Sequence, residues 1–222
     1  DVSKEASRLE GELGKYKDTA PEAGAALVKL TDLYHTHGRA FGLVRADQRF
    51  TAAQPTDPRH PKIMLQLMDG LEALTRNKEF AVNARQFLTR YPKAKECPDV
   101  EIRLAYTLDK LDEKARAAAA YRDCWNRQPN AKGREYGQAA CRLFAQSGGA
   151  GALPGAQLAE EMFDKLPKDE YAKNIGLRSY YEYRRISKWA EANVIGNKLV
   201  RSRLVKNADQ LRELHRTMGL NY

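Results

Sequence analysis

The sequence predicts an all-α fold: a right-handed α-solenoid of about five antiparallel helix pairs, with a capping helix at each end. Helix-forming residues dominate the chain, and apolar residues recur at three- and four-residue steps. Pro55, Pro92, Pro129 and Pro167 follow one another at steps of 37, 37 and 38 residues. Four or five positions before each proline lies an aromatic residue: Phe50, Phe87, Trp125 and Phe163. A fixed period of this length is typical of repeat arrays, which offer extended binding surfaces.

Composition excludes a membrane-spanning helix. The chain has 222 residues, of which 42% are hydrophobic, and no stretch approaches the ~18 consecutive apolar residues that a spanning helix needs. The chain begins at Asp1 rather than Met, so we expect a processed product or a segment of a longer protein.

The N-terminal cap (1–20) and the first repeat (21–57) open the array. We expect a capping helix over 2–17, after which Thr19, Pro21 and Glu22 resemble a helix start with a capping box. Gly38 divides the first repeat, and three prolines within residues 55–61 end it. The two helices of this repeat are predicted over 21–36 and 39–53.

The middle repeats follow the same plan. The second repeat (58–95) is predicted to contain helices over 61–75 and 78–91. The third repeat (96–131) starts at Pro98, a favourable first-turn residue, and its helices are predicted over 98–110 and 112–127.

The last part of the chain contains two repeats and a cap. In the fourth repeat (132–169) we expect helices over 132–147 and 155–166, separated by a glycine-rich flexible linker over 147–155. The fifth repeat (170–206) lacks a closing proline, and its helices are expected over 169–185 and 187–204. The C-terminal cap (207–222) is expected to form a helix over 207–218 that ends at Gly219.

Residues within the period resemble those of tetratricopeptide repeats, whose pattern is W-x2-L-G-x2-Y, then A-x3-F, then P. The first unit contains Leu27-x2-Leu30-Thr31-x2-Tyr34. The third contains Leu104-Ala105-x2-Leu108 and then Ala117-x3-Tyr121. Small residues precede aromatic ones in the second and fourth units, at Ala84 with Phe87 and at Ala159 with Phe163.

The resemblance implies closely packed helix pairs with aromatic residues between successive pairs. The period of 37–38 residues is longer than the usual 34, so HEAT-type repeats of 40–47 residues are the structural alternative. Residues 87–111 resemble bacterial cell-envelope scaffold proteins of the tetratricopeptide type. That resemblance implies a scaffold in the bacterial periplasm or cell envelope rather than the cytoplasm.

No pattern predicts catalysis, a metal or a cofactor. His35 and His37 point about 200° apart on a helix, so they cannot share a metal ion. The run Gly148-Gly149-Ala150-Gly151 lacks the Lys-Ser or Lys-Thr of a phosphate-binding loop. Cys124 and Cys141 fall on neighbouring expected helices, which allows one disulfide, although buried free thiols are favoured.

The positive charge lies near the C-terminus. Between Lys173 and Arg216 there are 11 Lys or Arg and 4 Asp or Glu, so this segment carries 11 − 4 = +7 of the formal +9. In its first helix we expect one side to be buried, comprising Ala172, Ile175, Ser179, Tyr183, Ile186 and Ala190. The opposite side and the next helix supply the predicted partner-binding residues, Arg178, Tyr181, Arg184, Arg185, Lys188 and Arg201, with further charge from Lys198, Arg203 and Lys206. An ordinary solvated helix face explains the same pattern.

Three functions are compatible with these patterns. The first is a non-enzymatic scaffold that binds a protein or an acidic peptide. The second is binding of a nucleic acid or another polyanion by the basic fifth repeat. The third is a helical accessory domain of a larger enzyme, such as one that cleaves peptidoglycan. We favour the scaffold, because the period is clear and catalytic motifs are lacking. The oligomeric state stays open.

Overall fold

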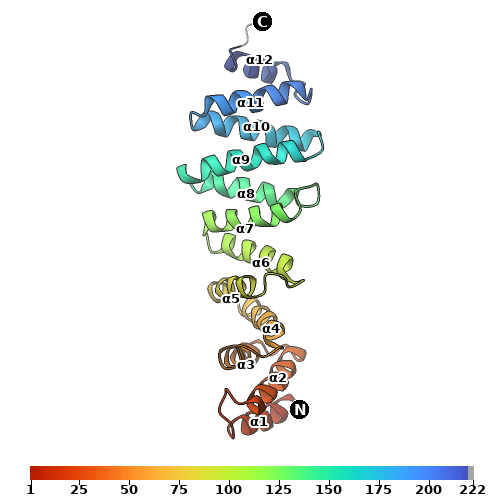
Figure 1. Cartoon of the computed structure of the whole chain (residues 1–222), viewed down its shortest axis with the longest axis vertical. Helices are drawn as coiled ribbons and strands as arrows, with labels where there is room; N and C mark the ends of the chain where they lie inside the picture. Colours follow the sequence, from red (N-terminus) through yellow and green to blue (C-terminus); the bar gives the residue numbers. More distant parts are fainter. Residues whose placement is uncertain (220–222) are drawn as a thin grey trace. The chain divides into compact units, whose positions relative to one another are not determined.

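The computed structural model describes residues 1–219, apart from the side chains of Ala150 and Thr217. The described residues form twelve α-helices joined by short turns, which confirms the all-α prediction (Figure 1). Their bounds are α1 Val2–Leu13, α2 Pro21–Thr36, α3 Ala40–Ala53, α4 His60–Ala73, α5 Asn77–Arg90, α6 Cys97–Lys110, α7 Lys114–Arg127, α8 Arg134–Gln146, α9 Gly149–Lys165, α10 Glu170–Arg185, α11 Trp189–Arg201 and α12 Ala208–Thr217. Residues 220–222 of the predicted C-terminal cap lie outside the described part.

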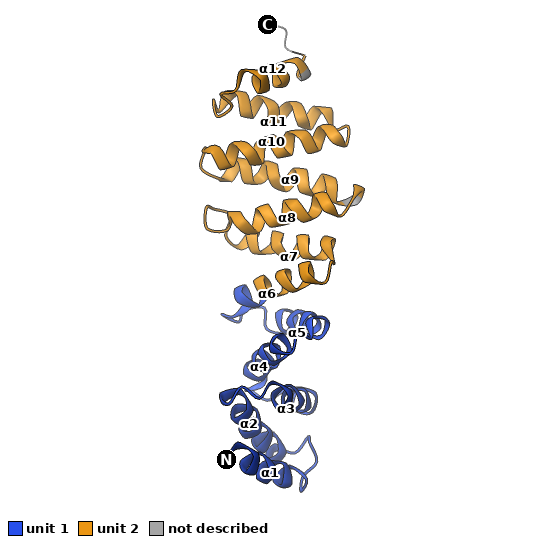
Figure 2. Ribbon diagram, turned by 180° about the vertical axis from the view of Figure 1, so that it is seen from behind, with its two compact units in different colours: residues 1–100 blue, residues 101–222 orange. Residues whose placement is uncertain are grey.

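The chain divides into two compact units, residues 1–100 and 101–222, with the division inside α6 (Figure 2). Within each unit the helices pack in sequence order, α1 to α5 in unit 1 and α7 to α12 in unit 2. The right-handed superhelix and the division into five repeats stay predictions.

In unit 1, aromatic and aliphatic side chains from successive helices fill the core. Phe50, Phe80 and Phe87 are fully buried together with Leu27 and Leu67. The first helix is shorter than the predicted range of 2–17, since α1 ends at Leu13. The link to α2 is held by the Gln54 amide, which donates to the main-chain oxygens of Asp18 (2.6 Å) and Ala20 (3.0 Å).

In unit 2, small residues allow large ones to pack between neighbouring helices. Trp125 is fully buried, and Phe163 is almost so. A Cβ added to Gly176 of α10 would lie 2.7 Å from the Phe163 ring and 2.9 Å from Leu199, so only glycine fits there without a shift. Small residues at helix contacts and aromatic residues between pairs are what the tetratricopeptide resemblance implies.

The turn between the two helices of each pair contains a residue with positive φ. These residues are Gly38 (62°), Thr75 (54°), Asp112 (58°), Gly148 (84°) and Ser187 (59°). In four of these turns the residue after the positive-φ position donates its backbone N–H to a carbonyl five residues back, as Arg39 does to Tyr34. This is the Schellman arrangement, which ends a helix and satisfies its last carbonyls.

The predicted flexible linker over 147–155 is wrong. Helix α9 begins at Gly149 and includes Gly151, Pro154 and Gly155. A Cβ at Gly151 would lie 2.2 Å from the Phe144 carbonyl oxygen, so α9 packs tightly on α8 there. Gly151 and Gly155 serve close helix packing, and Gly148 provides the positive φ of the turn, so the run of glycines does not indicate a flexible linker here.

The predicted buried side of the first helix in the fifth repeat is also wrong for two of its residues. Ala172, Ile175, Ser179 and Tyr183 are buried, but Ile186 is half-buried and Ala190 is exposed. Helix α10 ends at Arg185, and the chain turns at Ser187, which has a positive φ. The three- and four-residue spacing of buried positions in α10 therefore does not continue to Ile186 and Ala190.

The three cysteines are buried free thiols, so Cys124 and Cys141 are not bridged. Among the described residues, no helix combines the length and the apolar character needed to cross a lipid bilayer.

Candidate protein-binding surface

Helix α10 starts with a strong cap and buries the side that faces α9. The Asp169 carboxylate accepts from the Ala172 N–H at 2.9 Å, and Glu170 lies in the first turn. Ser179 Oγ donates to the Ala156 carbonyl at 2.9 Å. With that side buried, the i, i+3, i+4 spacing leaves another side of α10 in solvent.

The exposed side consists of Arg178, Tyr181, Glu182 and Arg185, which we call the α10 face. Tyr181 is 45% exposed, and its ring rests edge-on against Tyr180 at a centroid distance of 5.2 Å. Arg185 donates to Glu182 at 2.7 and 2.9 Å. Arg178 is half-buried and has no ion pair with any residue that the structure describes. The α10 face therefore combines an unpaired guanidinium with an accessible aromatic ring.

Helix α8 continues this surface on one side. Tyr171 of α10 donates its hydroxyl to the Arg134 carbonyl oxygen (3.0 Å) and to Gln138 Oε1 (3.2 Å). The Arg134 guanidinium lies over the Tyr171 ring, 5.1 Å from its centroid. Burial raises the pKa of Tyr171 to about 12, so its hydroxyl stays protonated and remains a donor. These contacts join the start of α10 to the start of α8.

Arg142 adds a further cation on α8, bound to Asp109 of α6 at 3.0 Å. Sequence reasoning missed Arg134, Gln138 and Arg142, because it followed charge only in the fifth repeat. Comparing the first helix of one repeat with the first helix of the next would have found them, since repeats stack in order.

Two of the predicted partner-binding residues point elsewhere. Arg184 Nη1 donates to Glu213 Oε1 of α12 at 2.9 Å. Its guanidinium also lies 5.6 Å from the centroid of the Tyr180 ring and 5.8 Å from that of Trp189. Lys188 lies at the N-cap of α11 and pairs with Glu191 at 3.5 Å. Arg184 therefore contributes to holding α10, α11 and α12 together, whereas the ion pair of Lys188 stays within the start of α11.

Arg201 lies in a third place. It is the last residue of α11, whereas Lys188 lies at the start of the same helix. Because α11 has 13 residues and a helix rises 1.5 Å per residue, the two ends of α11 are about 20 Å apart. Arg201, Arg203 and Lys206, which we call the basic loop, are exposed and form no ion pair within the described residues. The six predicted residues thus occupy three locations rather than one patch.

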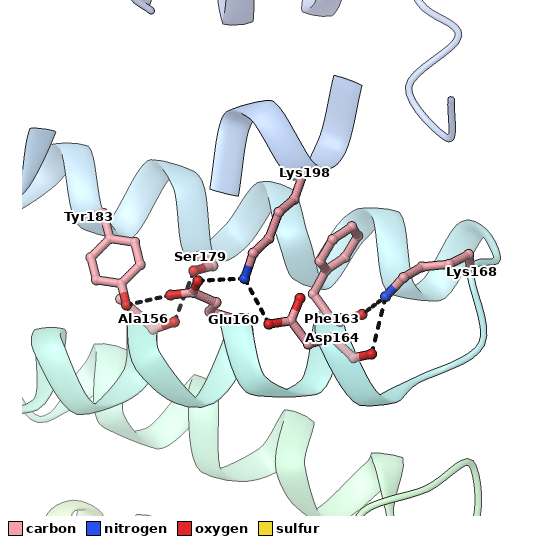
Figure 3. Close-up of polar contacts among 8 residues, drawn as sticks. All are labelled: Ala156, Glu160, Phe163, Asp164, Lys168, Ser179, Tyr183 and Lys198. Atoms are coloured by element: carbon pink, nitrogen blue, oxygen red, sulfur yellow. Dashed lines mark hydrogen bonds and ion pairs between the residues drawn. The ribbon is translucent and has the colours of Figure 1, made fainter. Parts of the chain in front are cut away.

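Lys198, which the sequence assigned to the same basic charge, is paired with two partly exposed carboxylates of α9. Its Nζ lies 2.9 Å from Glu160 Oε1 and 2.7 Å from Asp164 Oδ2 of α9 (Figure 3). Tyr183 donates to the other Glu160 oxygen at 2.9 Å. Burial, and after it this contact with Glu160, raises the pKa of Tyr183. Lys168 donates to the last carbonyls of α9, on Phe163 and Asp164.

The partners of Lys198 lie 38 and 34 residues earlier in the chain, which is about one repeat period. A search for opposite charges one period apart would have found this junction.

The described residues contain no cluster of three or more His, Cys, Asp or Glu that could hold a metal ion. Burial raises the pKa of the Cys124 and Cys141 thiols to about 12. Neither sulfur is therefore a thiolate near neutral pH, and neither has the character of a nucleophile.

No family model matches the chain, and no curated protein matches it. Among solved structures, it is similar to a tetratricopeptide repeat protein from Parabacteroides merdae, with 14% identity, TM-score 0.48 and coverage of 89% of this chain and 74% of that one. It is similar to MamA, with 16% identity, TM-score 0.47 and coverage of 85% and 100%. It is also similar to PilF of Pseudomonas aeruginosa, with 13% identity, TM-score 0.41 and coverage of 97% and 96%.

These likenesses concern the fold. The chain has a tetratricopeptide-like fold, and this statement rests on its own helix pairs, small-residue contacts and interleaved aromatic residues.

Proposed function

We propose that the chain is a non-enzymatic scaffold that binds an acidic segment of a protein partner on the α10 face and the adjoining side of α8. The observation that carries the proposal is the unpaired Arg178 next to the exposed Tyr181 ring. A guanidinium matches a carboxylate with two parallel hydrogen bonds, and an exposed tyrosine supplies apolar contact with a polar tip.

The surrounding residues are suited to an acidic ligand. Arg185 is half-exposed, and its partner Glu182 lies on the same helix. Exposed intrahelical pairs contribute little to stability, so a carboxylate from a partner can replace Glu182 at low cost. Arg134 of α8, whose guanidinium lies over the Tyr171 ring of α10, supplies a further cation beside the start of α10.

The test is affinity capture from lysate of the source organism, with nuclease treatment. The bait would be the wild-type chain, an Arg178→Glu/Arg185→Glu variant of the α10 face, or an Arg201→Glu/Arg203→Glu variant of the basic loop. Both variants lose the same charge, so net charge cannot explain a difference between them. Circular dichroism checks that each variant folds.

We expect a discrete protein partner that survives nuclease, is lost with the α10-face variant and is retained with the basic-loop variant. A further bait that carries only the substitution Tyr181→Ser should capture the partner about 5–30-fold more weakly than the wild-type chain, because an aromatic contact of about 1–2 kcal/mol is removed. Retention of all partners by the α10-face variant would contradict the proposed surface.

The basic loop supports a second candidate, binding of a nucleic acid or another polyanion. Its three cations are exposed and unpaired within the described residues, whereas most other cations of the fifth repeat are paired. Binding of a fluorescent single-stranded DNA oligonucleotide that falls steeply with salt, and that is abolished by Arg201→Glu/Arg203→Glu, would support it. Absence of binding at low salt would reject it.

The third candidate, an accessory domain of a larger enzyme, stays a hypothesis. Sequencing the gene on either side of the region that encodes residues 1–222 tests it, because this hypothesis requires an adjoining catalytic domain in the same reading frame.

A further inference from the structure

Asp47 is the most unusual titratable residue of unit 1. It lies in α3 with no exposed surface, and neither of its carboxylate oxygens has a hydrogen-bond partner among the described residues. The other buried side-chain oxygen without a partner in the described part of unit 1 is Gln66 Oε1 of α4. Both Asp47 oxygens are acceptors when the carboxyl group is ionised, and no described donor reaches either of them.

The charged groups on the neighbouring helices do not supply a counter-ion. Helix α2 contributes Asp32 and His35, and α4 contributes Lys62 and Asp69. The Lys62 ammonium binds Asp32 at 2.8 Å, and the His35 ring lies 3.8 Å from the Asp69 carboxylate.

The contacts of Glu79 on α5 likewise supply no counter-ion for Asp47. Its Glu79 carboxylate accepts from Arg76 at 2.6 Å and from the Gln48 amide at 3.3 Å. The charged groups that act on Asp47 are two carboxylates, Asp32 and Asp69, and one lysine, Lys62, that is already paired with Asp32.

An ionised carboxylate that is buried without partners is strongly unfavourable, and such a group takes up a proton instead. Burial raises the pKa of Asp47 to about 8, and the negative charges of Asp32 and Asp69 act in the same direction. Lys62 opposes this shift but does not cancel it.

We propose that Asp47 is a neutral carboxylic acid in the folded chain, and that its proton links the stability of unit 1 to pH. The next repeat shows that the position does not need a carboxyl group, since Ala84 lies one period of 37 residues later and is fully buried. Asp47 thus adds a proton-binding group at a place where the neighbouring repeat has a small apolar one.

The sign of the linkage follows from the two pKa values. An aspartate in the unfolded chain releases its proton near pH 4, whereas Asp47 in the folded chain keeps it up to about pH 8. Between these limits the folded state binds about one proton more, so each unit of rising pH favours unfolding of unit 1 by up to tenfold. Below about pH 4 and above about pH 8 the contribution of Asp47 is constant.

Hydrogen exchange with mass spectrometry on the full chain tests the proposal, with Asp47→Asn as the matched variant. Asparagine keeps the shape of the side chain but does not titrate. At each pH, the ratio of wild-type to variant exchange rates cancels the pH dependence of exchange chemistry and of all other titrating groups, including His60. Peptides of α8 to α11 in unit 2 serve as the internal control.

We expect the ratio for peptides of α2 to α4 to rise with pH between about 4 and about 8, by up to tenfold per unit, and then to level off. The ratio for unit 2 should stay flat. A ratio for α2 to α4 that does not change with pH would overturn the proposal.

A second measurement keeps the test valid if Asp47→Asn fails to fold. Carbon NMR of the Asp47 carboxyl in the wild-type chain should show a midpoint far above that of an ordinary aspartate. Asp32→Asn should lower that midpoint, because it removes one of the negative charges that favour the proton. A midpoint near pH 4 in the wild-type chain would show that Asp47 is ionised, and it would overturn the proposal.

Discussion

At the scale of single residues, the turns within the helix pairs show most directly what this sequence tolerates. Three of the five positive-φ turn residues are not glycine: Thr75, Asp112 and Ser187. A side chain with a Cβ pays roughly 1–2 kcal/mol in this left-handed region, and a β-branched one is the least suited to it. The hydrogen bonds of the Schellman turn hold these residues in place in spite of that strain.

Replacing these residues with glycine should stabilise the chain, in a graded order. We expect Thr75→Gly to add about 0.5–1 kcal/mol, Ser187→Gly somewhat less, and Asp112→Gly least, because aspartate tolerates this region best. Thermal denaturation would measure the changes. Gly38→Ala is the reverse control and should destabilise by about 1 kcal/mol, since Gly38 has a φ of 62° with open space around it. Lower stability of Thr75→Gly would contradict the strain argument.

At the scale of helices, much of the array could be predicted from local patterns, because repeat helices bury the same side again and again. The aromatic residues Phe50, Phe87 and Trp125 are all in the core, as their period indicated. The predicted helix starts and ends mostly lie within two residues of the observed ones, since capping residues and prolines act locally.

What could not be predicted depends on contacts between helices that are far apart in sequence. Glycine in a turn and glycine at a helix contact look alike in one sequence, so the start of α9 at Gly149 was missed. The division of the basic residues among three locations was also missed. Arg184 meets Glu213 29 residues later, a pairing that no local pattern within α10 reveals.

Substitutions at the start of α9 test whether packing, rather than flexibility, explains its glycines. Gly151→Ala should destabilise unit 2 by about 1–3 kcal/mol, because the new methyl group would lie 2.2 Å from the Phe144 carbonyl oxygen and 2.3 Å from Ser147 Oγ. Gly149→Ala is the matched control in the same helical turn. It has nothing within 4 Å of the added Cβ, so it should be neutral or slightly stabilising. Urea denaturation measures both, and equal effects of the two would favour a flexible linker.

At the scale of the whole molecule, the number of Lys and Arg residues in the fifth repeat overstates the positive charge that this repeat offers to a partner. Arg184, Arg185, Lys188 and Lys198 are each within 4.0 Å of a carboxylate. The cations of the fifth repeat that form no ion pair within the described residues are Arg201, Arg203 and Lys206 of the basic loop and Arg178 of the α10 face. Charge that a whole-chain count assigns to one end of the array thus separates into distinct surfaces, each of which can be altered without the other.

The two compact units should also respond separately to damage, because each helix pair in a repeat array contacts only its neighbours and cooperativity decays along the array. Phe50→Ala removes a fully buried ring from unit 1, at a local cost of about 3–5 kcal/mol. We expect hydrogen exchange to accelerate in α2 to α4 and to stay unchanged in α8 to α11. Phe163→Ala, at an almost fully buried ring of unit 2, should produce the reverse pattern. Equal loss of protection in both units from either substitution would show that the chain unfolds in one all-or-none step, and independent repeat behaviour would then be excluded.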